Sequence, residues 1–394
     1  CMSQVELTTL GKSCEFFNGK AHEKDIDENG KYIVVNSKFI SQEGRVVKRT
    51  KEQMFPLYKG DIVMVMSDVP NGKALAKCFI IDKDDTYSLN QRICCIRSKA
   101  FDTKYLYYQL NRHEHFLAFN NGENQTNLRK DDILDCPLIK PSMEEQRRMV
   151  AELDVVKSKM NQAKSNVERN IVNSLDIFQS ELNNCFSNQD GKWKQTSLGQ
   201  VCHFVRGPFG GSLKKNIFKT EGYAVYEQQH AIYDQFDEIR YFIDEKKFEE
   251  MKRFELKAGD LIMSCSGTIG KVAIVPNGIQ KGIINQALLK LTPKDILNVS
   301  FLKYYMESLT FKIEIAKNSQ GAAIKNVASV AILKLIQVPL PSIEEQNQIV
   351  ERLNKLLIEV KKLESNYTNK LHFFDEFNSG IFKKAFENEL IEAE

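Results

Sequence analysis

The sequence lacks the patterns on which several common classes of protein depend. It has no apolar run long enough to cross a bilayer, since oily stretches such as residues 78–81 are only as long as a strand. Its nine cysteines show no CxxC pair and no zinc-binding spacing, because Cys94 and Cys95 are adjacent. No secretory signal is recognisable in the given sequence. We therefore expect reduced thiols, a cytoplasmic location and no membrane partner.

Motifs for nucleotide hydrolysis and for base methylation are missing as well. Residues 267–271 place two residues between their glycines and Val272 after the lysine, whereas a phosphate-binding loop needs four residues and then Ser or Thr. No Pro-Pro occurs in the chain, so the Asn/Asp-Pro-Pro-aromatic tetrad with which an adenine methyltransferase grips a flipped base is absent. We expect no catalytic residue, no metal and no cofactor on this chain.

Strong charge of one sign is also lacking. The chain has 55 basic and 52 acidic residues, a formal charge of +3 over 394 residues. This balance neither indicates nor excludes a nucleic-acid partner, because acids and bases can lie on different faces. The length allows two domains of ordinary size, each with its own core.

What the chain does contain is an internal repeat. Pro-Ser-Met-Glu-Glu-Gln at 141–146 returns as Pro-Ser-Ile-Glu-Glu-Gln at 341–346. Looser matches occur in the same order: 8–16 with 196–204, Gly19 with Gly207, 59–64 with 258–263, Asn90-Gln91 with Asn285-Gln286, and 122–127 with 321–326. Such a repeat predicts two copies of one unit, with a shared frame and divergent segments between the matches.

Each hexapeptide precedes a long amphipathic helix. Apolar residues recur every three or four positions for about 45 residues, hence over roughly 65 Å. Ser142 with Glu145, and Ser342 with Glu345, form capping boxes. A helix this long cannot bury its own stripe, so we expect the two to pack on each other as a coiled coil; the alternative is that each stripe packs on its own globule. The expected contact residues are Leu153, Met160, Val167, Leu175, Leu182, Leu353, Val360, Tyr367, Phe374 and Ile381.

The segments between the helices mix both kinds of secondary structure. Residues 32–35, 62–65 and 261–263 are β-rich runs bounded by Gly, Asp or Asn, while 101–119 and 300–317 have helical periodicity. The prediction is an α+β fold: two pseudo-repeated mixed α/β domains joined by two long helices packed as an antiparallel coiled coil. The expected segments are domain 1 at 2–140, helix 1 at 141–187, domain 2 at 188–340 and helix 2 at 341–390.

These features resemble a known family, the DNA-specificity subunits of type I restriction-modification systems. The resemblance covers nearly the whole chain and depends on the two hexapeptides, the Gly259-Asp260 turn, residues 266–271 and residues 318–322. The first half departs locally, because residues 68–73 replace the second half's Gly-Thr-Ile-Gly-Lys.

The resemblance implies a non-catalytic subunit with two target-recognition domains and an antiparallel coiled-coil spacer. Its expected partners are double-stranded DNA, two methyltransferase subunits that carry S-adenosylmethionine, and ATP-dependent nuclease or translocase subunits. Two half-sites on one face of DNA lie about 34–36 Å apart, and a stiff helical spacer can fix that separation.

Loop residues that could contact DNA are basic or carry amides, since Arg and Lys suit guanine and Asn and Gln suit adenine. For each one the alternative is a solvated loop or a polar strand end, and Trp193 is expected to pack in a core. The candidates in the second half are Arg206, Lys214, Lys215, Gln228, Gln229, His230, Ser266, Thr268, Lys271, Gln320 and Lys325. The candidates in the first half are Lys20, His22, Asn36, Lys48, Arg49, Asn124, Gln125 and Arg129.

A second function stays open on sequence grounds. A structural adaptor whose globules bind proteins would need the same globules and long helices. Its binding to random-sequence duplex DNA would show no dependence on salt.

Overall fold

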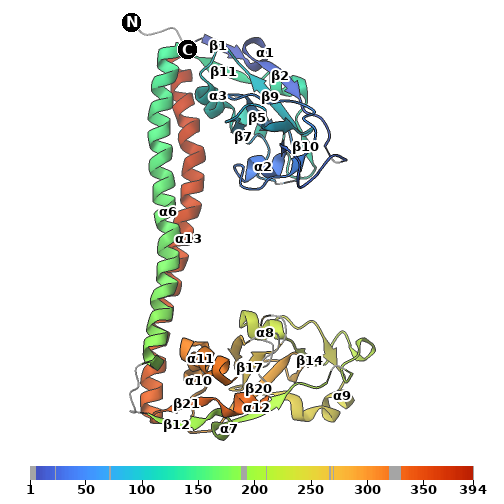
Figure 1. The fold of residues 1–394 in the computed structure, drawn as a ribbon, viewed down its shortest axis with the longest axis vertical. Helices are drawn as coiled ribbons and strands as arrows, with labels where there is room; N and C mark the ends of the chain where they lie inside the picture. The colour runs from blue at the N-terminus through green and yellow to red at the C-terminus, as the bar shows by residue number, and fades with distance from the viewer. Residues whose placement is uncertain are drawn as a thin grey trace. The chain divides into compact units, whose positions relative to one another are not determined.

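The computed structural model describes residues 6–22, 24–70, 72–187, 193–209, 211–265, 268, 270–318 and 330–393. It divides into two compact units (Figure 1). Unit 1 comprises Cys1–Val167 and Asn369–Glu394, and unit 2 comprises Glu168–Thr368. Each unit therefore holds one globule and one end of each long helix.

Unit 1 is built on a four-stranded antiparallel sheet in the order β2-β9-β5-β7 and a three-stranded sheet, β4-β3-β8, in which β3 and β8 run parallel. Its strands are β1 Glu6–Thr9, β2 Glu15–Asn18, β3 Tyr32–Val35, β4 Arg49–Thr50, β5 Ile62–Val65, β6 Ser67–Asp68, β7 Cys78–Ile80, β8 Tyr87–Leu89, β9 Ile93–Arg97, β10 Thr126–Asn127 and β11 Pro137–Lys140. Its helices are α1 Leu10–Ser13, α2 Ser37–Ser41, α3 Thr103–Leu110, α4 Glu114–Leu117 and α5 Lys130–Leu134.

Unit 2 repeats this plan with the sheets β13-β20-β17-β18 and β15-β14-β19-β16, in which β14 and β19 are the parallel pair. Its strands are β12 Lys194–Ser197, β13 Cys202–Arg206, β14 Tyr223–Tyr226, β15 Phe242–Ile243, β16 Glu255–Leu256, β17 Leu261–Ser264, β18 Val272–Ile274, β19 Gly282–Ile284, β20 Leu288–Pro293 and β21 Gln337–Leu340. Its helices are α7 Leu198–Val201, η1 Lys215–Ile217, α8 Gln228–Tyr233, α9 Glu245–Glu250, η2 Lys252–Phe254, α10 Val299–Glu307, α11 Leu309–Asn318 and α12 Val330–Leu335. The predicted repeat of two mixed α/β globules is confirmed.

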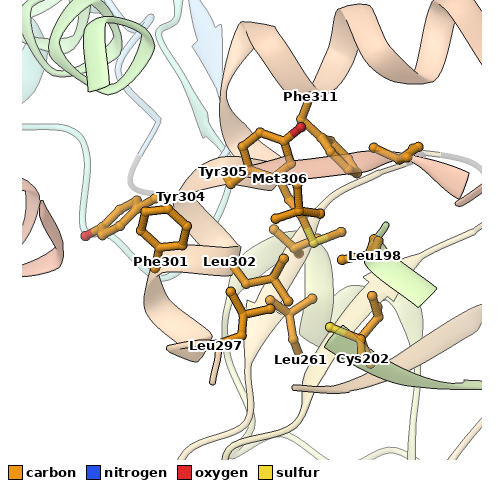
Figure 2. Close-up of a cluster of buried hydrophobic side chains, with 14 of the residues drawn as sticks. Leu198, Cys202, Leu261, Leu297, Phe301, Leu302, Tyr304, Tyr305, Met306 and Phe311 are labelled. Carbon is orange, nitrogen blue, oxygen red and sulfur yellow. The ribbon is translucent and has the colours of Figure 1, made fainter. Parts of the chain in front are cut away.

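The core of unit 2 lies between its antiparallel sheet and the helices α10 and α11. Phe301, Leu302 and Tyr305 are almost completely buried and belong to one cluster with Leu261 of β17 and Cys202 of β13 (Figure 2). Trp193 packs near Phe301, with ring centroids 6.3 Å apart, so the expectation that it is a packing residue is met.

The last residue of each hexapeptide fastens a long helix to its globule. Gln346 is fully buried; its Oε1 accepts from the backbone N–H of Asn298, and its Nε2 donates to the carbonyls of Pro341 and Ile296. Gln146 is buried too and bonds in the same way to the backbone N–H of Asp102 and to Pro141 O. The repeated glutamine thus satisfies backbone groups that would otherwise be buried without partners.

The predicted capping boxes form only in part. Ser142 Oγ accepts from Glu145 N and Ser342 Oγ from Glu345 N, each at 3.2 Å. The two carboxylates bond elsewhere. Glu145 pairs with Arg148, and Glu345 accepts from Trp193 Nε1 at 2.9 Å.

The long helices are α6, Met143–Ser187, and α13, Ile343–Ala393, close to the predicted bounds. Within each unit one end of α6 lies beside one end of α13, in antiparallel directions (Figure 1). In unit 2, Arg352 forms an ion pair with Glu181, and Ile177 and Leu356 line one shallow hollow. In unit 1, the Phe386 ring meets Tyr105 of the globule at 5.5 Å.

The residues of the predicted contact stripe differ in burial. Leu153, Leu182, Leu353 and Val360 are buried, but Leu175 is 47% exposed. Leu175 is therefore not buried in the helix pair, as a coiled-coil contact would require. Met160, Val167, Tyr367 and Phe374 are half-buried, and the Ile381 side chain lies outside the described part of the structure.

A buried serine occupies the inner position next to Leu175. Ser174 is 4% exposed, and its hydroxyl donates to the carbonyl of Asn170 at 2.8 Å. The spacing of hydrophobic residues in the sequence does not indicate that a serine is buried at this position. Leu182 and Leu353 also belong to the core cluster of the unit 2 globule, so the helix ends pack on the globule as well as on each other.

The two shorter helical predictions each fall into two helices. Residues 101–119 form α3 and α4, because Arg112 adopts a left-handed conformation with φ 64° and its N–H bonds to Ala76 O. Residues 300–317 belong to α10 and α11, which are separated by Ser308 with ψ 158°.

Candidate nucleic-acid interface

One end of the antiparallel sheet of unit 2 gathers five of the eleven candidate side chains of the second half. Arg206 ends β13 opposite Leu289, and Ser264 ends β17 opposite Leu288. The hydrogen bonds Gly207 N to Leu288 O and Cys265 N to Ala287 O join the adjoining loops. We call this surface loop edge 2 and define it by residues 206–209, 226–229, 268, 270–271 and 285–288.

Within loop edge 2, Arg206, Thr268 and Lys271 are exposed, whereas Gln228 and Gln229 are half-buried. The two glutamines begin α8, which follows the parallel strand β14; the bond from Asn285 N to Tyr226 O links that strand end to the β19–β20 turn. Amides and positive charges therefore share one surface of unit 2.

Unit 1 builds the equivalent surface, loop edge 1, from residues 18–20, 35–38, 66–68, 90–92 and 125. Asn90 N bonds to Val35 O, Met66 N to Arg92 O, and Gln125 Nε2 to Ser67 Oγ. Three predicted residues, Lys20, Asn36 and Gln125, meet at this surface.

Two glycines explain why the strand ends approach so closely. A Cβ on Gly19 would lie 2.1 Å from the carbonyl oxygen of Asn90, and a Cβ on Gly207 would lie 1.8 Å from that of Asn285. No side chain fits at either place without moving backbone. The repeated pairs Gly19 with Asn90 and Gly207 with Asn285 thus mark one contact, made once in each unit.

The hairpin loops of the two edges are held by different hydrogen bonds. In unit 2, Ser264 Oγ donates to Thr268 O and accepts from Lys271 N. In unit 1, the Asp68 carboxylate accepts from the backbone N–H groups of Val69, Ala74 and Leu75. A carboxylate on loop edge 1 repels phosphate, so the two loops differ in the partners that they favour.

Both candidate histidines prove to be structural. His22 is 1% exposed; its Nδ1 donates to Lys20 O, and Ser88 Oγ donates to its Nε2. His230 is equally buried and bonds to Glu227 N and Glu238 O. Neither ring reaches solvent, so the predicted DNA contact is wrong for both in this conformation.

The remaining candidates are not among the residues that define the two loop edges. Arg49 is half-buried and donates to Gly30 O and Lys31 O. Arg129 caps α5 through its own backbone, whose N–H bonds to Asp132. Lys48, Asn124, Lys214 and Lys215 are exposed, and Ser266, Gln320 and Lys325 lie outside the described residues.

Two exposed residues at the centre of the edges were missed by sequence reasoning. Arg92 and Gln286 lie in the β8–β9 and β19–β20 turns. Arg92 follows the repeated Asn-Gln pair, and Ala287 occupies the same place in unit 2: Arg92 N bonds to Asn90 Oδ1 and Ala287 N to Asn285 Oδ1. The signal was present in the repeat, since the residue next to a shared pair differs between the halves.

The described part of the chain shows no arrangement suited to catalysis by metal or thiolate. No group of three or more His, Cys, Asp or Glu side chains there could hold a metal ion. Burial raises the pKa of Cys94, Cys136 and Cys202 to about 12, so these thiols stay protonated at neutral pH and are poor nucleophiles. Among the described helices, none is both long and apolar enough to cross a membrane.

Units 1 and 2 thus have similar frameworks that carry different polar and basic side chains. The family model for the type I restriction modification DNA specificity domain matches residues 2–169 and 190–372. The chain therefore belongs to this family of DNA specificity domains, and it is a non-catalytic sequence-recognition polypeptide.

Similar proteins agree with this assignment. The chain is 24% identical over 329 residues to the specificity subunit of the type I restriction enzyme EcoBI of Escherichia coli, covering 77% of this chain and 69% of that protein. It is 22% identical over 392 residues to the MjaVIII specificity subunit of Methanocaldococcus jannaschii, covering 93% and 89%.

Solved structures share the fold. A chain from a study of the assembly and conformational transition of the type I R-M system matches with a TM-score of 0.72, 18% identity and 97% of both chains covered. The HsdS subunit from Thermoanaerobacter tengcongensis matches with a TM-score of 0.56 and 18% identity, covering 97% of this chain and 96% of that chain.

Proposed function

We propose that this chain recognises a bipartite DNA target, with loop edge 1 contacting one half-site and loop edge 2 the other. The observation that carries the proposal is the pairing of one framework with different side chains. Both edges contain the same glycine–asparagine contact. Arg92 of unit 1 is exposed at the place where unit 2 has Ala287. The hairpin of edge 1 is held by hydrogen bonds to Asp68, and that of edge 2 by hydrogen bonds to Ser264. Such a pair suits two different short sequences.

The helices α6 and α13 then act as the spacer between the half-sites and as the docking surface for two adenine methyltransferase subunits. Exposed apolar side chains support a docking role, because Val172, Leu175, Ile177 and Ile358 are each 47% exposed or more. The methyltransferase subunits would supply S-adenosylmethionine and the pocket for the flipped adenine. With an ATP-dependent nuclease partner, the same complex would restrict unmethylated DNA.

The test is a salt titration of duplex DNA binding, with the full chain alone and in complex with its methyltransferase subunits. A DNA-recognition subunit shows affinity that falls with salt, by about 0.9 in logarithmic slope per phosphate contact. Arg206→Ala should weaken binding and lower the slope by up to about one contact. Ile296→Ala is the control, because Ile296 is exposed beyond Pro293, at the opposite end of β20 from loop edge 2. A wild-type complex without salt dependence would support the adaptor instead.

A further inference from the structure

Phe209 is the most exposed large hydrophobic side chain in the described part of the chain. It is 93% exposed, whereas Tyr233 reaches 71% and Leu335 65%. A single exposed apolar residue needs no explanation in general. The position of Phe209 does need an explanation, because this residue lies on loop edge 2, two residues beyond Gly207.

The backbone that carries Phe209 is well anchored. Gly207 and Pro208 are buried, and the Gly207 N–H bonds to Leu288 O at 2.9 Å. On the far side, Ser212 N bonds to Phe209 O at 2.9 Å, and Leu213 is buried in a cluster with Phe248. The ring is therefore presented to solvent from a fixed base, with little ordering left to be done on binding.

The surroundings of the ring match a polyanion. Residues 203–220 contain four basic residues, Arg206, Lys214, Lys215 and Lys219, and no Asp or Glu. The first three are exposed, and Lys219 lies 3.9 Å from Asp244. Basic residues precede and follow Phe209 in the sequence, and positive charge suits a duplex, whose phosphates flank its stacked bases.

Unit 1 shows that the framework does not require this ring. At the corresponding place Lys20 follows Gly19, its backbone N–H bonds to Leu89 O, and His22 turns inward to Ser88. The segment closes back onto the sheet. The outward aromatic is thus a property of unit 2 alone, as expected for a side chain that serves one half-site.

We propose that Phe209 inserts as an apolar wedge at a base step of the duplex held by loop edge 2, and kinks it there. The inference rests on the proposed function of that surface. Apolar side chains that enter between base steps partly unstack them and bend the helix axis. The step that Phe209 enters contributes to specificity through its ease of deformation, without hydrogen bonds to the bases.

The experiment uses the complete complex of this chain with its methyltransferase subunits. The probe is a duplex of about 40 base pairs that carries the site found by mapping methylated adenines. Donor and acceptor dyes are attached about 20 base pairs apart, on either side of the half-site that loop edge 2 contacts. Wild-type complex should raise energy transfer. Phe209→Ala should bind at least about tenfold more weakly and leave transfer near that of free DNA. Phe209→Trp should keep both properties, and Ile296→Ala should match wild type.

The outcomes separate the wedge from the wider function. If Phe209→Ala binds and bends like wild type while Arg206→Ala weakens binding, the wedge is refuted and DNA recognition stands. If Phe209→Ala instead loses methyltransferase subunits on gel filtration and bends DNA normally, the ring contacts protein and the wedge is refuted. If wild type binds no DNA in a salt-dependent way, the proposed function itself fails.

Discussion

The close contact of Gly207 with Asn285 gives a sharp prediction, because glycine can be changed to alanine both at this contact and at Gly211 in the same loop. Gly207→Ala puts a Cβ 1.8 Å from Asn285 O, whereas ordinary contact begins at 3.4 Å. The two segments must therefore separate by about 1.6 Å, the difference between these distances. Overpacking of this kind costs about 1–3 kcal/mol of stability.

The separation displaces the β13 loop from the β19–β20 turn, and both belong to loop edge 2. Each well-placed base contact contributes about 1–3 kcal/mol of discrimination, so the loss of one or two weakens specific binding by about tenfold or more. Binding to random-sequence DNA should change much less, because phosphate contacts tolerate small displacements better than base contacts do.

The control is Gly211→Ala in the same loop. A Cβ there meets nothing within 4 Å, so stability and binding should match wild type. Fluorescence anisotropy with specific and random duplexes measures the affinities, and urea unfolding measures stability. Gly207→Ala with wild-type specific affinity, or Gly211→Ala with an equal defect, would refute the argument from close approach.

Three further predictions concern other parts of the chain. Gln346→Ala removes the partner of the Asn298 N–H and of the carbonyls of Pro341 and Ile296, and should lower the free energy of unfolding by about 2–4 kcal/mol. The exposed Gln348→Ala should change this free energy by less than about 0.5 kcal/mol in urea titrations, and equal effects would contradict the fastening role. Arg92→Ala should relax specificity in one half-site only and lower the salt slope, and a change in both half-sites in a selection from randomised duplexes would argue against two separate edges. Burial raises the pKa of thiols such as Cys94 to about 12, so they stay protonated in the folded chain, whereas thiols of the unfolded chain ionise above about pH 9. The free energy of unfolding should therefore fall between pH 9 and 12. A thermal unfolding temperature that is unchanged from pH 8 to pH 10 would count against this burial.

Much of the architecture followed from repetition and periodicity. Hydrophobic spacing gave α6 and α13 because a long stripe at helical period has few alternatives. The repeated Gly-Asp pairs at 60–61 and 259–260 are explained by local backbone structure. Gly60 and Gly259 adopt φ 92° and 82°, and the following Asp61 and Asp260 each accept a backbone N–H three residues earlier, from Tyr58 and Lys257.

What sequence reasoning missed depends on burial of polar groups. His22 and His230 look the same in a sequence whether they face solvent or a buried hydroxyl or carbonyl. Gln146 and Gln346 belong to the repeated hexapeptides, yet nothing in the sequence indicates that each bonds to the backbone at the start of a helix about 45 residues away. Ser174 is buried beside the exposed Leu175 for a similar reason, since its hydroxyl donates to a carbonyl of its own helix.

The most direct test of the account is an exchange of one globule. Residues 14–138 of this chain are replaced by the corresponding segment of another member of the family, and methylated adenines are mapped in cells that express the hybrid with its methyltransferase. The account predicts a new sequence in one half of the target, with the other half and the gap retained. A change in both halves, or an unchanged target, would contradict recognition by two independent loop edges.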